Sequence, residues 1–258
     1  MSEPMFRPRS AIEIVDAGFS IYRAHFAALA AIWLILFGPF YIVGVLIGGT
    51  LGSTISNLSG LMVPVATGAT VAVVSDAMHD RAVTIRGAFG QIAGRAGMLV
   101  GVSFVQGLLT FLGMLLLIVP GVIVWCWTFA APMVVVVEHM GGTAGAFSRS
   151  RQLARGQFWH ILGTLALSWL IFFAVLIATG AGIGFFGAFI GLSETARDIF
   201  ISLVVTMVMP IAGAASGVLY FDLRVRNDGY DVERLAQTLD ASAPVEGTMS
   251  TEHLEPRQ

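Results

Sequence analysis

Charged residues are scarce in this chain, and long stretches contain none. Only 12% of the 258 residues are Asp, Glu, Lys or Arg, whereas ordinary globular domains carry about 25%. Four stretches are entirely free of charge: 26–75, 96–137, 156–193 and 199–221. A helix needs about 20 mostly apolar residues to cross the hydrocarbon of a bilayer. The charge-free stretches therefore exclude a water-soluble protein and predict a polytopic membrane protein.

Other absences narrow the chemistry. Cys126 is the only cysteine, so no internal disulfide can form, and its apolar surroundings predict a packing role. The sequence contains no GxSxG, HExxH or P-loop motif, which argues against an enzyme and predicts no cofactor. No dense basic domain is present, so nucleic acid is not expected as a partner. Residues 1–25 lack a signal-peptide pattern, and we expect the first span to stay in the mature protein.

The apolar stretches predict an all-α bundle of six transmembrane helices. Pro120 and Gly121 interrupt the second stretch and predict a tight hairpin there. Residues 180–191 are Gly-rich and apolar, and either extend the fifth helix or form an interfacial loop. We expect one membrane domain over 1–239, ending in a short helix at 231–239, and a disordered tail over 240–258. The predicted spans are 26–48, 55–76, 98–118, 121–138, 160–180 and 199–221.

The distribution of arginine predicts the orientation of the spans. In a six-span arrangement, 13 of the 14 Arg residues fall on one side, and only Arg197 falls on the other. Basic residues remain on the cytoplasmic side of bacterial inner-membrane proteins. Both termini are therefore predicted to be cytoplasmic, in a bacterial cytoplasmic membrane.

A threefold internal pattern underlies the span order. A short amphipathic segment precedes each odd-numbered span, and Ser10 and Glu13 have the spacing of a capping box at the start of the first. We infer three parallel pseudo-repeats, each an amphipathic cytoplasmic helix followed by a transmembrane hairpin. The expected apolar stripe of the first segment is Ile12, Val15, Phe19, Tyr22 and Phe26. Ile85, Phe89, Ile92, Ala96 and Leu99 form that of the second, and Phe147, Ser150, Ala154, Phe158 and Ile161 that of the third.

Each repeat also places charge at the cytoplasmic boundary, an acid after each even-numbered span and an Arg before each odd one. These residues predict a ring of ion pairs that could gate a central pathway. The competing interpretation is that each charge ends a helix at the headgroup level, where charge is inexpensive. The six residues are Arg23, Asp76, Arg95, Glu138, Arg155 and Asp222.

Acidic and imidazole side chains near the same boundary raise a third interpretation, a membrane-embedded hydrolase or metal site. It requires Asp76, His79, Glu138 and His160 to converge. Interfacial His residues commonly have no such role, so the sequence assigns no metal or catalytic residue.

Several segments together resemble a known family. These are VPGVI at 119–123, APMVVVVE at 131–138, AFSRS at 146–150, LARGQFW at 153–159, YFDLRVR at 220–226 and GYD at 229–231, with DAGF at 16–19 near the N-terminus. Over about 1–239 the chain resembles bacterial six-helix proteins related to the membrane domain of glycerophosphoryl diester phosphodiesterases. The resemblance implies the topology and a bacterial membrane. It implies no enzymatic activity, because no segment resembles the catalytic barrel.

These observations lead to a functional hypothesis. We expect a non-enzymatic membrane protein that organises lipid or protein partners at the cytoplasmic face, with anionic lipids attracted by its Arg residues. The alternative is a transporter, channel or lipid-translocating protein with a pathway between the three hairpins. The absence of charge in the middle of any span weighs against an ion-coupled transporter.

Overall fold

The computed structural model describes residues 8–139 and 142–228, and all regular structure in these two ranges is helical. The predicted all-α class is confirmed for this part of the chain. The helix expected at 231–239 and the disordered tail expected at 240–258 lie outside the described residues.

The helices follow one another in three sets of similar order, as the repeat predicts: a short helix and then a long hairpin. The first set is α1 (Ala11–Ala24), α2 (Phe26–Ile47), α3 (Gly49–Leu58), the 3₁₀ turn η1 (Ser59–Met62) and α4 (Val63–Met78). The second is α5 (Ile85–Ile92), α6 (Ala96–Leu116), α7 (Ile118–Thr128) and α8 (Ala131–Val137). The third is α9 (Thr143–Ala154), α10 (Phe158–Phe189) and α11 (Glu194–Asp228).

Six helical segments of the described chain are long and apolar enough to cross a membrane, as predicted. The question left open at 180–191 is answered in favour of a helix, because α10 continues unbroken to Phe189. The chain then turns at Gly191, whose φ of +69° lies in the left-handed region that glycine adopts readily. The six segments are Phe26–Ile47, Gly49–Met78, Ala96–Leu116, Ile118–Val137, Phe158–Phe189 and Glu194–Asp228.

Helix α1 confirms the predicted capping box but presents a different face to the core. The Ser10 amide donates to Glu13 Oε2 at 2.7 Å, and the Glu13 amide donates to Ser10 Oγ at 3.4 Å. Of the predicted stripe, Val15 is buried, whereas Ile12, Phe19 and Phe26 are exposed. The buried residues are Ile14, Val15 and Gly18. Close packing explains the difference, because a Cβ at Gly18 would lie 2.7 Å from the backbone of α11.

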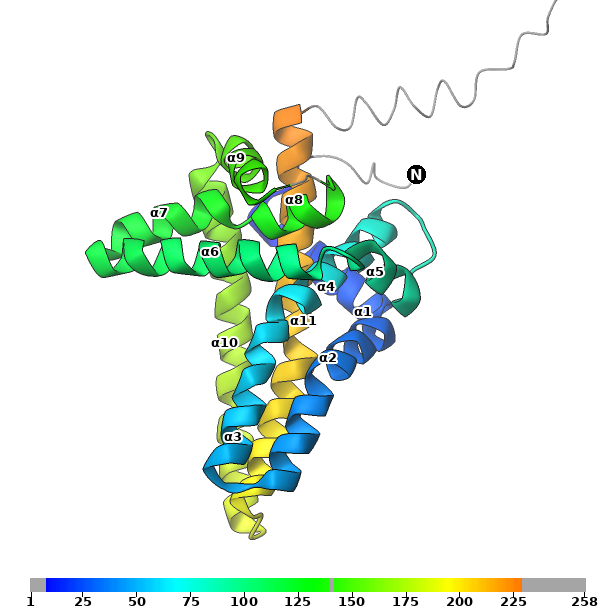
Figure 1. Cartoon of the computed structure of the whole chain (residues 1–258), viewed down its shortest axis with the longest axis vertical. Helices are drawn as coiled ribbons and strands as arrows, with labels where there is room; N and C mark the ends of the chain where they lie inside the picture. The colour runs from blue at the N-terminus through cyan, green and yellow to red at the C-terminus, as the bar shows by residue number, and fades with distance from the viewer. Residues whose placement is uncertain (1–7, 140–141, 229–258) are drawn as a thin grey trace, which may run out of the picture.

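Helix α11 is the central element, in contact with α1, α2, α4, α9 and α10 (Figure 1). Small residues let these neighbours approach. A Cβ at Gly213 would lie 3.1 Å from Thr70 of α4, and one at Gly217 would lie 3.2 Å from Val74. Because lipid competes equally well for apolar surface, membrane helices associate largely through such close contacts. The half of α11 nearest its C-terminus is therefore packed solidly against α4.

The second hairpin departs from the arrangement that three equivalent repeats predict. Figure 1 shows α6 and α7 running side by side across the long axis that α2, α4, α10 and α11 follow. Within α6 only Leu99 and Val102 are buried, both near its first turns, and the rest projects away from the bundle. The hairpin thus differs in direction from the other two, although its sequence is equally apolar.

The turn of this hairpin also lies slightly earlier than predicted. Leu117, in an extended conformation, separates the two helices, and Pro120 sits in the first turn of α7, where its missing N–H costs nothing. A Cβ at Gly113 would lie 2.8 Å from Gly121 Cα, so these two glycines bring α6 and α7 into direct backbone contact.

One end of the molecule gathers the Arg-rich connections. The C-terminal end of α11 lies there with α5, α8 and α9, whereas the α10–α11 turn near Arg197 lies at the opposite end (Figure 1). We call the first the Arg-rich end. Because the α6–α7 hairpin returns to the end where it begins, the grouping of the Arg residues does not depend on whether this hairpin crosses a bilayer.

Candidate functional site

The most developed polar structure of the described residues lies at the Arg-rich end, on the last three turns of α11. Oppositely charged residues four positions apart share a face of this helix. Arg226 Nε lies 2.7 Å from Asp222 Oδ2, and Arg224 Nε lies 3.8 Å from Asp228 Oδ2. Around these pairs, side chains from other elements complete two polar clusters.

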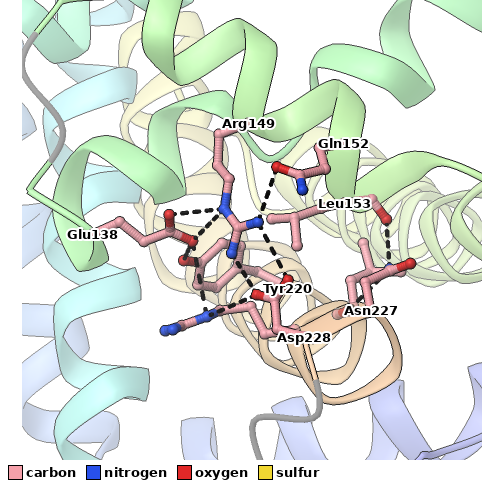
Figure 2. A network of polar contacts seen from close by, with 9 residues as sticks. Glu138, Arg149, Gln152, Leu153, Tyr220, Asn227 and Asp228 are labelled. Atoms are coloured by element: carbon pink, nitrogen blue, oxygen red, sulfur yellow. Dashed lines mark hydrogen bonds and ion pairs between the residues drawn. The ribbon is translucent and has the colours of Figure 1, made fainter.

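The first cluster, which we call the clamp, consists of Glu138, Arg149, Tyr220 and Asp228 (Figure 2). Arg149 of α9 donates from Nε to Glu138 Oε2 at 2.9 Å, just beyond α8. The same guanidinium donates to Asp228 of α11, from Nη1 to Oδ1 at 3.2 Å and also from Nη2 to Oδ2. The Tyr220 hydroxyl donates to Glu138 Oε1 at 2.8 Å. The clamp therefore fixes α8, α9 and α11 to one another.

Electrostatics favour a permanently charged Arg149. Burial alone would lower the pKa of its guanidinium, but the hydrogen bonds to Asp228 and Glu138 outweigh burial and raise that pKa above its ordinary value. Only 15% of the Arg149 side chain is exposed, and only 13% of Glu138. A pair this enclosed is costly to break from one side, because the remaining charge loses its nearest partner of opposite charge.

The second cluster is centred on Asp222, which is 3% exposed. Its Oδ1 accepts from the backbone amide of Arg9 at 2.6 Å, and its Oδ2 accepts from Arg226 Nε and lies 2.9 Å from His160 Nε2. Arg226 Nη2 in turn donates to the Arg9 carbonyl at 2.6 Å. One carboxylate thus joins the N-terminal segment, α10 and α11.

The third boundary carboxylate, Asp76 at the end of α4, is also buried. Its Oδ2 accepts from Gln91 Nε2 of α5 at 2.8 Å, and Arg95 Nη1 donates to the Gln91 carbonyl at 3.1 Å. Gln91 therefore bonds to Asp76 through its side chain and to Arg95 through its backbone carbonyl. His79 Nδ1 lies 2.6 Å from the Ser75 carbonyl, one turn earlier in α4.

The predicted ring of ion pairs among Arg23, Asp76, Arg95, Glu138, Arg155 and Asp222 is not what these contacts form. The three acids lie at one end of the bundle, but Glu138 pairs with Arg149, Asp222 pairs with Arg226, and Asp76 bonds to Gln91. Arg23 instead lies over the Phe19 ring, at 5.8 Å from its centroid, and Arg155 is exposed. The i, i+4 spacing of Asp222 and Arg226 was the available signal for one of the missed partners.

The residues of the hydrolase interpretation are likewise distributed over separate contacts. Glu138 belongs to the clamp, His160 to the Asp222 cluster, and Asp76 bonds to Gln91. Within residues 8–139 and 142–228, no group of three or more His, Cys, Asp or Glu side chains could hold a metal ion.

No protein-family model, curated protein or solved structure matches the chain. The class of protein consequently rests on the fold. Six long apolar helices, small-residue packing between them and polar clusters confined to one end define a multi-pass helical membrane protein.

Proposed function

We propose that this protein organises lipids of the cytoplasmic leaflet of a bacterial cytoplasmic membrane, without enzymatic activity. The observation that carries the proposal is the direction of the α6–α7 hairpin, across the axis of the other long helices (Figure 1). With that axis along the membrane normal, the hairpin lies within one leaflet. The Arg-rich end is the cytoplasmic end under the rule that basic residues stay inside.

The surface of the hairpin supports insertion into hydrocarbon. Phe104, Leu115, Leu116 and Ile118 are all more than 70% exposed, and no charged residue occurs in 96–137. An apolar surface of this kind is unfavourable in water. A helical hairpin satisfies its own backbone hydrogen bonds, so it can be surrounded by acyl chains. In one leaflet it would displace and order the neighbouring lipids.

Residues at the base of the hairpin have the character of a headgroup boundary. The Arg151 guanidinium lies 5.3 Å from the centroid of the Trp127 ring. Trp159, in the first turn of α10, is strongly exposed. Trp at the interface and Arg among anionic headgroups are both favourable. Ser150 Oγ donates to the Trp127 carbonyl at 2.9 Å, which joins the hairpin to α9 and so to the clamp.

The test is the lipid composition that accompanies the intact protein. The full chain is extracted into native nanodiscs and its lipids are quantified. The account predicts enrichment of anionic lipids over the bulk membrane, and a fall of that enrichment when Arg151 and Arg155 are both replaced by Gln. Arg197→Gln, at the opposite end, is the control and should leave the enrichment unchanged. Bulk composition in the wild-type discs, or an equal effect of the control, would overturn the proposal.

The alternative of a translocation pathway has less support. Between α4 and α11 the Arg-rich half is filled by small residues in close contact, such as Gly213 against Thr70. A pathway between the hairpins would require these helices to separate. Reconstituted vesicles showing protein-dependent lipid or solute movement would favour this alternative over lipid organisation. The family resemblance remains a proposal beside both functions and assigns no catalytic residue to either.

A further inference from the structure

A cavity of about 780 Å³ lies at the end of the bundle opposite the clamp, between α2, the α3–η1 segment and the first half of α11. Its volume is within the range of about 300–1,000 Å³ typical of small-molecule sites. Neither polar cluster of the Arg-rich end contributes to it.

Glycines shape the floor of this cavity. In the α2–α3 hairpin, Gly44 and Gly52 lie so close that a Cβ on either would collide with the backbone of the other. Gly38, one and a half turns earlier, lines the cavity, and a Cβ there would meet no other atom. The space at Gly38 is thus open, whereas that at Gly44 is filled by the neighbouring helix.

The lining is amphipathic. One part consists of apolar side chains that also face outward, among them Ile42 and Leu203. Another carries hydroxyl and amide groups, including Tyr41, Asn57 and Ser202. Since the exposed surface of a membrane bundle at this depth meets lipid, the cavity offers an acyl chain an apolar wall and a headgroup a polar one.

The charge of the cavity is negative. Asp198 is the one charged residue among the described residues that line it. The preceding Arg197 is directed elsewhere: its side chain packs toward α10, where a Cβ at Gly187 would lie 3.4 Å from Arg197 Nε. Nothing cationic on the cavity wall therefore offsets Asp198, and an anionic headgroup would be repelled.

From this geometry we propose that the cavity binds a zwitterionic phospholipid with a primary ammonium headgroup. The ammonium donates to the Asp198 carboxylate, and the phosphate and ester oxygens accept from hydroxyl and amide donors such as Ser202 and Asn57. One acyl chain lies along Ile42 and Leu203. A primary ammonium has three N–H donors, whereas a quaternary trimethylammonium has none, so the site distinguishes ethanolamine from choline. The site is independent of the cytoplasmic-leaflet function proposed above and lies at the other end of the molecule.

The first experiment is native mass spectrometry of the detergent-solubilised full chain, titrated separately with dioleoyl phosphatidylethanolamine and dioleoyl phosphatidylcholine, two zwitterionic lipids that differ only in the headgroup amine. We expect phosphatidylethanolamine to bind at least about tenfold more tightly than phosphatidylcholine, as one lost charge-assisted hydrogen bond would imply. Asp198→Asn should reduce this preference to about twofold or less. Glu194→Gln, one turn earlier and outside the lining, removes the same charge and should leave the preference intact. Equal affinities in the wild type, or an unchanged preference in Asp198→Asn, would overturn the proposal.

A second pair of variants tests the location of the site. A Cβ at Gly38 meets no atom within 4 Å, so Gly38→Leu should extend into the cavity and abolish phosphatidylethanolamine binding. Gly163→Leu, at an exposed position of α10 with equally open space around the Cβ, should retain binding. Soluble glycerophosphoethanolamine should not displace the lipid, because it lacks the acyl chain. Retained binding in Gly38→Leu, or displacement by the soluble headgroup, would place the lipid elsewhere and contradict the assignment.

Discussion

Arg149 and Glu138 form an ion pair of 2.9 Å between Nε and Oε2 that joins helix α9 to the end of α8. Both side chains are mostly buried, and the pair continues through Asp228 into α11. The consecutive helices α8 and α9 and the distant α11 therefore share one guanidinium. The stability of the Arg-rich end should depend on it more than on any exposed Arg nearby.

Replacing Arg149 by Gln should lower the free energy of unfolding by about 1.5–3 kcal/mol, because the largely buried Glu138 would lose a charge-assisted hydrogen bond and keep only the more distant Arg224 as a cation. SDS titration in mixed micelles, followed by circular dichroism, measures the change. Arg151→Gln is the matched control: it removes an exposed Arg from the same helix and should cost about 1 kcal/mol or less. Equal effects of the two changes would show that the clamp is not the stabilising contact.

The contribution of Arg149 should not vary between pH 6 and pH 9. Its hydrogen bonds to Asp228 and Glu138 raise the folded-state pKa of the guanidinium above its ordinary value. A cation whose pKa is raised on folding contributes stability that is fully present below its unfolded-state pKa. This stability is lost only as the pH rises through the folded-state pKa. The difference in stability between wild type and Arg149→Gln should therefore be flat over this window. A difference that shrinks from pH 6 to pH 9 would contradict the assigned charge state.

Asp222→Ala should release the N-terminal segment from the bundle. The backbone amide of Arg9 loses its acceptor, and Arg226 loses the carboxylate that aligns it with the Arg9 carbonyl. Hydrogen exchange of residues 9–14 should become about tenfold faster or more, as for a region that opens locally. Asp16→Ala, on the exposed side of α1, should leave this exchange unchanged. Unaltered exchange in Asp222→Ala would mean that packing of α1 alone holds the segment.

Much of the fold could be predicted from the sequence because the governing forces are local. Absence of charge identified the six long helices, and Ser10 with Glu13 correctly identified the start of α1. The Gly-rich stretch 180–191 was ambiguous, because glycine weakens a helix in water while lipid leaves the backbone no alternative partner. In the structure, helix α10 continues through this stretch as far as Phe189.

The direction of the α6–α7 hairpin and the partners of the acidic side chains could not be predicted from the sequence. The α6–α7 hairpin has no charged residue in 96–137, so no charged face indicates which way it runs. The acids Glu138 and Asp222 were recognised, but their partners depend on how α9 and α11 pack, and Arg149 was chosen over Arg155 by that packing. For α1, the close approach of Gly18 to Ala215 decided the buried face, and the more apolar Ile12 and Phe19 stayed exposed.

Close packing between α4 and α11 makes a further prediction. A Cβ at Gly217 would already lie 3.2 Å from the Val74 side chain, so Gly217→Leu would overpack this contact. The substitution should lower the free energy of unfolding by about 1–3 kcal/mol. SDS titration again provides the measurement. Gly163→Leu adds the same side chain where no atom lies within 4 Å and should be close to neutral. A neutral Gly217→Leu would mean that the two helices are less tightly packed than described.

The most direct test of the central claim is the position of the α6–α7 turn in the membrane. Cys126, the only cysteine, is replaced by Ser, and single cysteines are introduced at Leu116, at Thr50 in the first turn of α3 and at Ala144 on α9. In sealed spheroplasts an impermeant maleimide should label Thr50→Cys, and in inverted vesicles it should label Ala144→Cys. A hairpin held within one leaflet predicts that Leu116→Cys is unreactive from both sides. Labelling of Leu116→Cys in spheroplasts, as at Thr50→Cys, would show that α6 and α7 cross the membrane and would contradict the account.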